Sequence, residues 1–303
     1  MSTSDLAFLA DRTEPSNETG SNVLKIAVPN KGSLAESATV MLREAGYRQR
    51  SDPKDLVLVD DGSGVEFYYL RPRDIAVYVG EGTLDLGITG RDMLLDSGAA
   101  ATEVLALGFG GTRFRFAAPG GSAMGLADLA GKRIATSYPG LVQAYLEQAG
   151  VAARLIKLDG AVESSIRLGV ADVIADVVET GTTLKRAGLE LFGDAIMHSE
   201  AILIQRSGQD APAELPLLLR RLSGVMTARN FLMVDYNAPQ ALLEKTCAIT
   251  PGVDSPTVSP LAKQGWVAVR AMIPRRDAQR IMDELWDAGA DGILVTAIHA
   301  CRL

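Results

Sequence analysis

The sequence predicts an α/β protein with two lobes and a small third domain. From Leu24 onward, short apolar stretches typical of strands alternate with longer stretches of helical periodicity, which favours mainly parallel strands. A second series of the same kind begins near Thr112. The last part of the chain instead reads β-α-β-β-α-β, the order of the ferredoxin-like split βαβ unit. A length of 303 residues is consistent with two or three domains.

The first series begins with LKIAVP, which has the unbroken apolarity of a buried strand. A helix is predicted to follow and to end near Gly46, with Ser33 as its N-cap and Glu36 completing a capping-box pattern. In the rest of this lobe we expect strand-like segments at 74–82 and 84–90 and a helix at 91–99.

The second lobe and the third domain are predicted from the same two periodicities. In the second lobe we expect strands at 114–119, 133–139, 154–160 and 172–178 and helices at 125–132, 140–151 and 161–170. In the third domain we expect strands at 231–239, 256–261, 266–274 and 292–303 and helices at 240–249 and 277–289. Two lobes side by side leave a cleft between them, which is a preferred location for ligands.

The composition narrows the class of protein. With 47% hydrophobic and 22% charged residues, the chain has the balance of a soluble globular protein, and its apolar runs are too short for a membrane span. Residues 1–22 are polar and acidic, unlike a signal peptide, and are interpreted as a disordered tail. Two cysteines indicate a reducing, cytoplasmic location, and two histidines exclude a His-rich metal site. A net charge of −7 disfavours nucleic-acid binding but permits a basic cleft for small anions.

The stretch ADVVETGTTL, at 175–184, places a Val-rich strand directly before small hydroxyl residues and a helix. Backbone N–H groups at a helix start, a glycine and several hydroxyls together suit a phosphate. The two acidic residues suit ribose hydroxyls or Mg²⁺. A strand ending in a Thr-capped turn fits the same spacing, so both interpretations stay open at this point. The candidate residues are Asp176, Glu179, Thr180, Gly181, Thr182 and Thr183.

Several charged residues occupy loops or strand ends, where an open α/β sheet faces its ligand. Each basic residue alone is typical of a solvated surface, but together they indicate a polyanionic ligand. The loop LDGAVE adds Asp159 and Glu163, and Tyr138 is either a stacking partner for a base or a partly buried turn residue. The basic residues are Lys31, Arg71, Arg73 and Arg91.

The chain resembles the ATP phosphoribosyltransferase family in six stretches, which occur in the order LKIAVPNKGSL, FYYLRPRDI, DLGITGRDML, RIATSYP, LDGAVESS and DVIADVVETGTTL. It is similar to the long form of that family in AITPGVDSPTVSPL, WVAVRAMIPRRD and IMDELWDAGADGIL. The resemblance covers residues 23–303. It implies two lobes like those of type II periplasmic binding proteins, with the chain crossing between them twice, and an added ferredoxin-like regulatory domain.

The family catalyses the first step of histidine biosynthesis. ATP reacts through N1 of its adenine with 5-phosphoribosyl 1-pyrophosphate, giving phosphoribosyl-ATP and pyrophosphate, and Mg²⁺ is required. By resemblance, the first lobe is expected at 23–112 and 203–224, the second at 113–202 and the regulatory domain at 225–303.

The resemblance also implies roles for the candidate residues. Residues 176–183 are expected to hold the 5-phosphate and ribose, and Glu163 and Asp176 are the expected Mg²⁺ ligands. The four basic residues are expected to form a wall for pyrophosphate and the phosphates of ATP, and Tyr138 to line the cleft. The expected catalytic residues are Lys31, Arg71, Glu163 and Asp176. The loop departs from the family pattern at Glu179, where it is more acidic.

Free histidine is expected, again by resemblance, to inhibit the enzyme through the C-terminal domain, at a site distant from the cleft. Asn237 stands where the family has a carboxylate, so a weaker hold on the cationic groups of histidine is expected. A homo-oligomer, either a dimer or a hexamer, is also implied. The expected contacts with histidine are Asn237, Val253, Ser255, Thr257 and Gly292.

Two other classes of protein are compatible with two lobes. A solute-binding protein would carry a signal peptide or lipid anchor and would not need the Thr-rich loop. An inactive regulatory paralogue would not need Lys31 or the 176–183 loop. The presence of Lys31 and of the Thr-rich loop at 176–183 therefore favours an enzyme.

Overall fold

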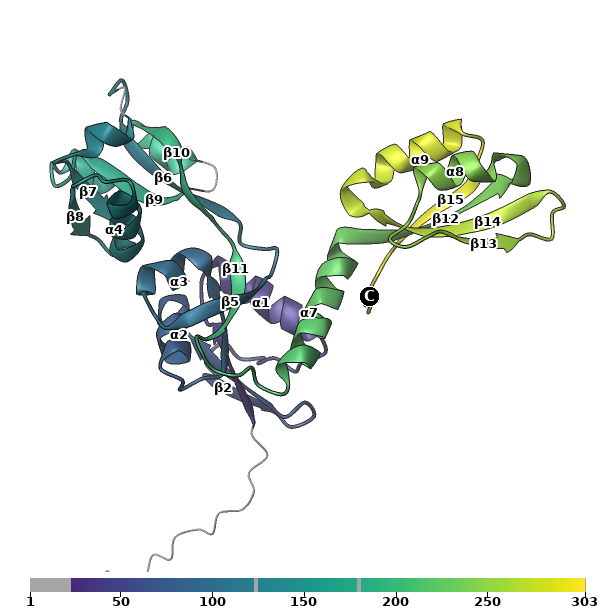
Figure 1. Cartoon of the computed structure of the whole chain (residues 1–303), viewed down its shortest axis with the longest axis horizontal. Helices are drawn as coiled ribbons and strands as arrows, with labels where there is room; N and C mark the ends of the chain where they lie inside the picture. The colour runs from purple at the N-terminus through teal and green to yellow at the C-terminus, as the bar shows by residue number, and fades with distance from the viewer. Residues whose placement is uncertain (1–22, 123–124, 179–180, 303) are drawn as a thin grey trace, which may run out of the picture.

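The computed structural model describes residues 23–122, 125–178 and 181–302, so the predicted tail at 1–22 lies outside it. Three sheets organise the described residues, and each sheet belongs to a separate part of the molecule (Figure 1). Two of these parts are the lobes, and the third is joined to them by the helix α7. No helix within the described residues is both long and apolar enough to cross a membrane.

Lobe I is built on a six-stranded sheet of order β2-β3-β1-β4-β11-β5. Helices α1 and α7 cover one face of this sheet, and α2 and α3 cover the other. The bounds are β1 Leu24–Pro29, α1 Ser33–Glu44, β2 Val57–Asp60, β3 Val65–Leu70, α2 Pro72–Gly80, β4 Leu86–Gly90, α3 Arg91–Ser97, β5 Ala101–Ala106, β11 Ala201–Arg206 and α7 Leu215–Asn230.

Two expectations for lobe I are corrected. Residues 74–82 do not form a strand, because most of them belong to α2. Ile75 and Val79 are buried one helical turn apart, and Pro72 begins the helix, so the helical period decides the structure here. The sheet is also mixed: only the central strands β3, β1 and β4 are parallel, and the remaining pairs are antiparallel.

Lobe II has a five-stranded sheet of order β10-β6-β9-β7-β8. The helix expected at 161–170 is reduced to the single turn α5, since Ala161 has a φ of 47° and cannot start a longer helix. Strand β10 was not predicted. The bounds are β6 Thr112–Pro119, a 3₁₀ turn Leu126–Leu129, β7 Arg133–Thr136, α4 Pro139–Gln148, β8 Arg154–Lys157, α5 Ser164–Arg167, β9 Val173–Val178, α6 Thr182–Arg186 and β10 Leu189–Ser199.

The chain crosses between the lobes twice. It leaves lobe I after β5 to enter β6, and it returns from β10 into β11, which lies in the lobe I sheet between β4 and β5. This is the connectivity expected for two lobes of the type II periplasmic-binding-protein kind. The crossings are adjacent, because the N–H of Ala201 bonds to the carbonyl of Phe109 at 2.9 Å.

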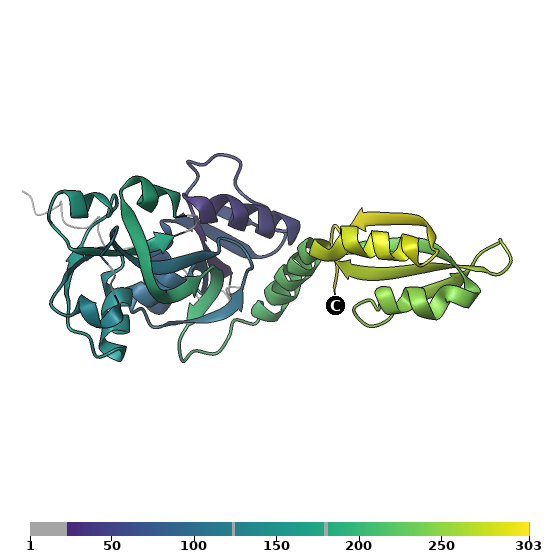
Figure 2. The ribbon, with the colours of Figure 1, turned by 90° about the horizontal axis from the view of Figure 1, so that it is seen from above.

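The third domain is the predicted ferredoxin-like unit. Its sheet has the order β13-β14-β12-β15 with every pair antiparallel, and α8 and α9 cover one face of it (Figure 2). The boundary predicted at 225 falls inside α7, which continues to Asn230. The bounds are β12 Phe231–Pro239, a 3₁₀ turn Gln240–Leu242, α8 Leu243–Ile249, β13 Thr257–Pro260, β14 Trp266–Pro274, a 3₁₀ turn Arg275–Asp277, α9 Ala278–Asp287 and β15 Asp291–Ala297.

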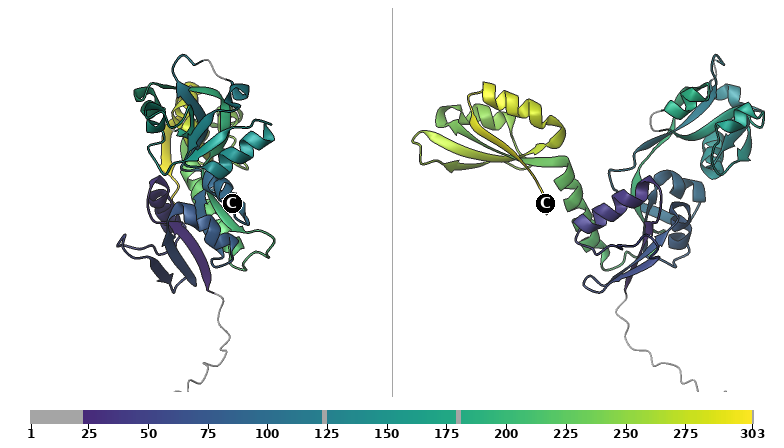
Figure 3. Two further views of the ribbon diagram at one scale, coloured as in Figure 1. Left: turned by 90° about the vertical axis from the view of Figure 1, so that its left-hand side faces the viewer. Right: turned by 180° about the vertical axis from the view of Figure 1, so that it is seen from behind.

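Helix α7 contacts both of the parts that it joins (Figure 3). Arg229, near its end, pairs with Glu44 of α1 at 2.8 Å, and Arg275 of the third domain donates to the Arg229 carbonyl at 2.7 Å. In the middle of α7, Gly224 lies against the C-terminal segment, and its carbonyl accepts from the Cys301 thiol at 3.2 Å. The third domain is thus attached through side-chain contacts as well as through the chain.

Candidate active site

A cavity of about 630 Å³ lies between the lobes, at the ends of the strands that point toward each other. Lobe I contributes the loops after β1 and β3, and lobe II contributes the loops after β7 and β8. This is the ligand-facing edge of an α/β sheet. The lining residues are Lys31, Gly32, Arg71, Pro72, Arg73, Asp74, Met93, Ser137, Asp159 and Gly160.

The start of α1 opens into this cavity. The predicted N-cap, Ser33, is instead the first helical residue, and Gly32 takes the cap position with a φ of 79°. The predicted capping box is therefore wrong, and no side chain in the described part of the chain caps this helix. The uncapped N–H groups beside Lys31 provide a partial positive charge that suits an anion.

Two of the cavity cations have no partner within the described residues. Neither Lys31 nor Arg71 forms an ion pair or a side-chain hydrogen bond in that part of the chain. Arg71 precedes Pro72 at the beginning of α2, and this places it at the rim of the sheet. Since no group among the described residues pairs with either side chain, both are available to a polyanion.

A second cavity, of about 310 Å³, contains the Thr-rich loop. Glu163, Asp176, Thr182 and Thr183 line it together. Gly181 is the N-cap of α6 and has a left-handed φ of 72°, which glycine adopts without strain. Two other candidates, Glu179 and Thr180, lie outside the described residues. The sequence therefore identified a group of residues that share one concave surface.

Asp176 has an unusual electrostatic environment. Burial raises the pKa of its carboxyl, the N–H of Val177 opposes that rise, and the nearby Glu163 adds to it. Arg73 of lobe I lowers the same pKa, so the two cavities lie within electrostatic reach of each other. Two carboxylates that repel each other suit a divalent cation. Within the described residues there is no group of three or more His, Cys, Asp or Glu that could hold a metal ion.

Arg91 and Tyr138 are engaged by protein groups. Arg91 lines a different cavity and donates two hydrogen bonds to the Glu103 carboxylate, at 2.7 and 2.8 Å. Its Nη2 also lies 3.3 Å from Glu200 Oε1. Arg91 consequently lowers the pKa of Glu103. Tyr138 is 6% exposed, with Arg73 over its ring at 4.1 Å and the edge of Phe114 at 5.2 Å between centroids. Its ring is not open to a base in this arrangement.

Sequence reasoning missed Asp92, a buried carboxylate between the lobes. It is 5% exposed, and its Oδ1 accepts from the hydroxyl of Ser199 at 2.8 Å, next to the second crossing. The N–H of Asp92 also donates to that hydroxyl oxygen at 3.0 Å. Its charge raises the pKa of both Tyr138 and Asp176. The sequence feature that could have identified Asp92 is an acidic residue near the start of the helix predicted at 91–99.

The residues expected to bind histidine fall into two groups. Asn237 and Gly292 adjoin across β12 and β15, since a Cβ on Gly292 would lie 2.7 Å from the Asn237 Nδ2. Gly292 also has a φ of 58°, which favours glycine. Thr257 begins β13, which pairs with β14 and not with β12, and Val253 and Ser255 lie in the loop before it.

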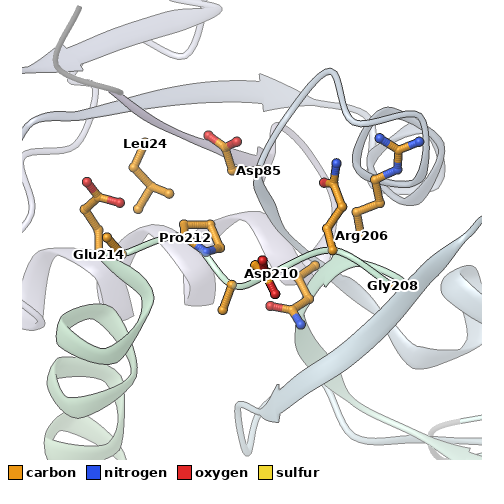
Figure 4. A pocket seen from close by; sticks show the side chains of 11 residues that line it. Leu24, Asp85, Arg206, Gly208, Asp210, Pro212 and Glu214 are labelled. Atoms are coloured by element: carbon orange, nitrogen blue, oxygen red, sulfur yellow. The ribbon is translucent and has the colours of Figure 1, made fainter.

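Another cavity, of about 600 Å³, lies at the far end of lobe I and contains none of the predicted site residues (Figure 4). Asp85, Arg206, Asp210 and Glu214 give it mixed charge, and the Asp85 carboxylate already accepts the N–H of Lys25 at 2.8 Å. The predicted chemistry is thus concentrated in the cavities at the facing ends of the lobes.

Fold and site together define a two-lobed α/β enzyme of the kind that binds phosphorylated substrates, with an attached ferredoxin-like domain. Two family models match the chain: ATP phosphoribosyltransferase over residues 71–224, and the HisG C-terminal domain over residues 228–300. The chain belongs to the ATP phosphoribosyltransferase family. Its activity is the first step of histidine biosynthesis, the transfer of a phosphoribosyl group to ATP.

Individual relatives agree with the family match. The ATP phosphoribosyltransferase of Paenarthrobacter aurescens strain TC1 is 59% identical over 286 residues, which cover 93% of this chain and 100% of the relative. That of Arthrobacter sp. strain FB24 is 58% identical with the same coverage. A solved structure of the ATP phosphoribosyl transferase (HisG:HisZ) complex from Thermotoga maritima aligns with a TM-score of 0.57 at 28% identity, covering 67% of this chain and 98% of that one.

Proposed function

We propose that the lobes divide the substrates between them. Lobe II holds the phosphoribosyl group through the loop after β9, and lobe I holds pyrophosphate and the phosphates of ATP through Lys31, Arg71 and Arg73. The observation that carries this division is a pair of cations, Lys31 and Arg71, which line a cavity shared by both lobes and have no ion-pair partner among the described residues. A polyanion there would neutralise charges that protein groups in the described part of the chain leave unbalanced.

The chemistry requires positioning more than a strong nucleophile. Displacement at the anomeric carbon passes through an oxocarbenium-like state while negative charge develops on the leaving pyrophosphate. The Lys31 and Arg71 side chains and the N–H groups at the start of α1 lie where they would stabilise that charge. Asp176, Thr182 and Thr183 would orient the ribose and its 5-phosphate, so that the adenine nitrogen of ATP meets the reacting carbon.

Mg²⁺ would be held by Glu163 and Asp176, which share the second cavity. When bound, the ion neutralises phosphate oxygens of the substrate and so eases departure of pyrophosphate. Support comes from the Asp176 carboxyl, whose pKa is raised by burial and further by the charge of Glu163, since a bound cation would offset both effects.

Mixing the protein with ATP, 5-phosphoribosyl 1-pyrophosphate and Mg²⁺ tests the reaction. We expect phosphoribosyl-ATP and pyrophosphate in equal amounts, measured by chromatography, and loss of both when Mg²⁺ is chelated. Formation of free ribose phosphate without phosphoribosyl-ATP would contradict the proposed placement of ATP.

We further propose that free histidine inhibits through the third domain, beside Asn237 and Thr257. Support comes from the close approach of Asn237 and Gly292, two of the expected contacts, and from the contacts of α7 with both α1 and the third domain. Coupling requires histidine to bind two global states unequally. Because α1 begins just after Lys31, a shift of α7 would reach the cleft through Glu44.

Two substitutions test this site. Thr257→Ala should weaken inhibition by histidine, and Asn237→Asp should strengthen it about tenfold, since a carboxylate adds a charge-assisted contact to a cationic ligand. Both variants should keep the parent kcat without histidine. Histidine that competes directly with ATP, together with unchanged inhibition of both variants, would refute the proposal.

Two broader features belong to the same proposal. The free thiols Cys247 and Cys301 support a cytoplasmic location. A homo-oligomer is supported by the uncovered face of the third-domain sheet, where the Leu294 side chain is 64% exposed. Analytical ultracentrifugation would distinguish a dimer or hexamer from a monomer.

A further inference from the structure

The N-terminus of α4, in lobe II, is capped by a residue of lobe I. The N–H groups of Gly140 and Leu141 donate to Asp96 Oδ1 at 2.8 and 3.1 Å, and Asp96 belongs to α3. Tyr138, at the N-cap position, makes no side-chain capping bond. A carboxylate at this position compensates both the free N–H groups and the helix dipole. A cap is usually local, whereas this one spans the two lobes (Figure 1).

The two helices approach closely at Gly140. A Cβ added to this residue would overlap the carbonyl oxygen of Asp96, at a separation that real Cβ atoms do not show. Gly140 does not have a left-handed φ, so the backbone of α4 would accept alanine. The approach of α3, and not the conformation of the helix, therefore requires glycine at this position.

The same carboxylate also contacts a cation of the cleft. Asp96 Oδ2 lies 3.3 Å from Arg73 Nη1, and the Arg73 guanidinium covers the Tyr138 ring at 4.1 Å. The Asp96 side chain is only 13% exposed, while that of Arg73 is 44% exposed and lines the interlobe cavity. Arg73 is thus fixed on one side by lobe I and on the other by lobe II.

We propose that Asp96 is a positioning residue for phosphoribosyl transfer, which couples closure of the lobes to the placement of Arg73. Separation of the lobes removes the cap from α4, and it also removes the Tyr138 ring from Arg73. Closure restores both contacts through one carboxylate and holds Arg73 where the leaving pyrophosphate is expected. This inference rests on the proposed role of Arg73 in binding pyrophosphate, and Asp96 itself touches no substrate.

Three variants separate the parts of the contact. Asp96→Asn keeps an oxygen for the α4 N–H groups but not the charge that holds Arg73. Asp96→Ala removes both contacts. Gly140→Ala introduces a methyl group that keeps α3 and α4 apart, while alanine favours the helix itself. Asp128→Asn is the matched control, because Asp128 Oδ2 accepts the Gly125 N–H at 2.7 Å entirely within lobe II.

We expect kcat to fall about tenfold in Asp96→Asn with little change in KM. In Asp96→Ala and Gly140→Ala, kcat should fall and KM for both substrates should rise. The melting temperature of Gly140→Ala should be no lower than that of the parent, and Asp128→Asn should stay within about twofold of parent activity. Parent-like kinetics in Asp96→Ala and Gly140→Ala would overturn the inference. So would losses of activity that only follow losses of thermal stability.

A double-mutant cycle with Arg73→Ala distinguishes this inference from the proposed function. If Arg73→Ala alone leaves activity unchanged, the assignment of Arg73 to pyrophosphate fails, and the inference fails with it. If Arg73→Ala is impaired, and the fold-loss of activity in the double variant equals the product of the two single fold-losses, the proposed function stands and the coupling is wrong. The expected result is that the double variant is scarcely worse than Arg73→Ala.

Discussion

The two lobes share an α/β plan but differ in the charge that they present to the cleft. Lobe I presents mainly cations, Lys31, Arg71 and Arg73, together with Asp74, whereas lobe II presents Asp159, Glu163 and Asp176 beside threonine hydroxyls. Neither set alone suits a phosphoribosyl pyrophosphate bound to a divalent cation, because one would repel the cation and the other the phosphates. Under the proposed division of the substrates, closure of the lobes brings both sets of side chains to one ligand, in addition to excluding water.

The largest effect is expected from lobe II. Asp176→Asn should weaken binding of 5-phosphoribosyl 1-pyrophosphate with Mg²⁺ at least tenfold, since the loss of a charge-assisted contact costs roughly 1.5–3 kcal/mol. Isothermal calorimetry measures the affinity. Asp172→Asn is the control, because that carboxylate pairs with Arg133, away from both cavities that form the proposed site. Equal affinity in parent and Asp176→Asn would make the loop a structural turn.

A smaller effect is expected from lobe I, where several cations are proposed to bind the same phosphate groups. Arg71→Gln or Lys31→Met should each lower kcat/KM for ATP about tenfold, because one of several charge-assisted contacts is lost. The melting temperature should stay the same, since neither side chain has an ion-pair partner in the described residues. Lys25→Met, at the other end of β1, should behave as the parent in steady-state assays. A large drop in melting temperature would indicate a structural role.

The smallest effect concerns the stability of the ligand-free protein. The folded-state pKa of Asp176 is raised, mainly by burial, so this carboxyl contributes stability at low pH that is lost as pH rises through that pKa. An amide at this position does not ionise, so Asp176→Asn should melt at a higher temperature than the parent at pH 8. The difference should shrink as the pH falls toward about 4. Scanning calorimetry without Mg²⁺ measures this difference in melting temperature. A variant less stable than the parent at pH 8 would contradict a free-energy cost for burying the ionised Asp176 carboxyl.

The sequence was sufficient for the architecture, because strand and helix periodicities repeat over many residues. It failed where one local feature decided the structure. Ala161 shortens a helix through its φ, and the stretch at 74–82 is apolar enough to resemble a strand. Loop residues that follow the strands reach the cleft as expected, because strand ends meet at one edge. Asp92 and Asp96 were missed because their partners, Ser199 and Gly140, are distant in sequence.

Arg91 has a consequence for the two crossings between the lobes. Its guanidinium is already neutralised by Glu103 and Glu200, and Glu200 also accepts the N–H of Gly108 at the first crossing. An anion that recruits Arg91 has to compete with two carboxylates at once. Glu103 lies in β5, just before the first crossing, and Glu200 lies between β10 and β11, in the second. One guanidinium therefore ties both connections between the lobes to the start of α3.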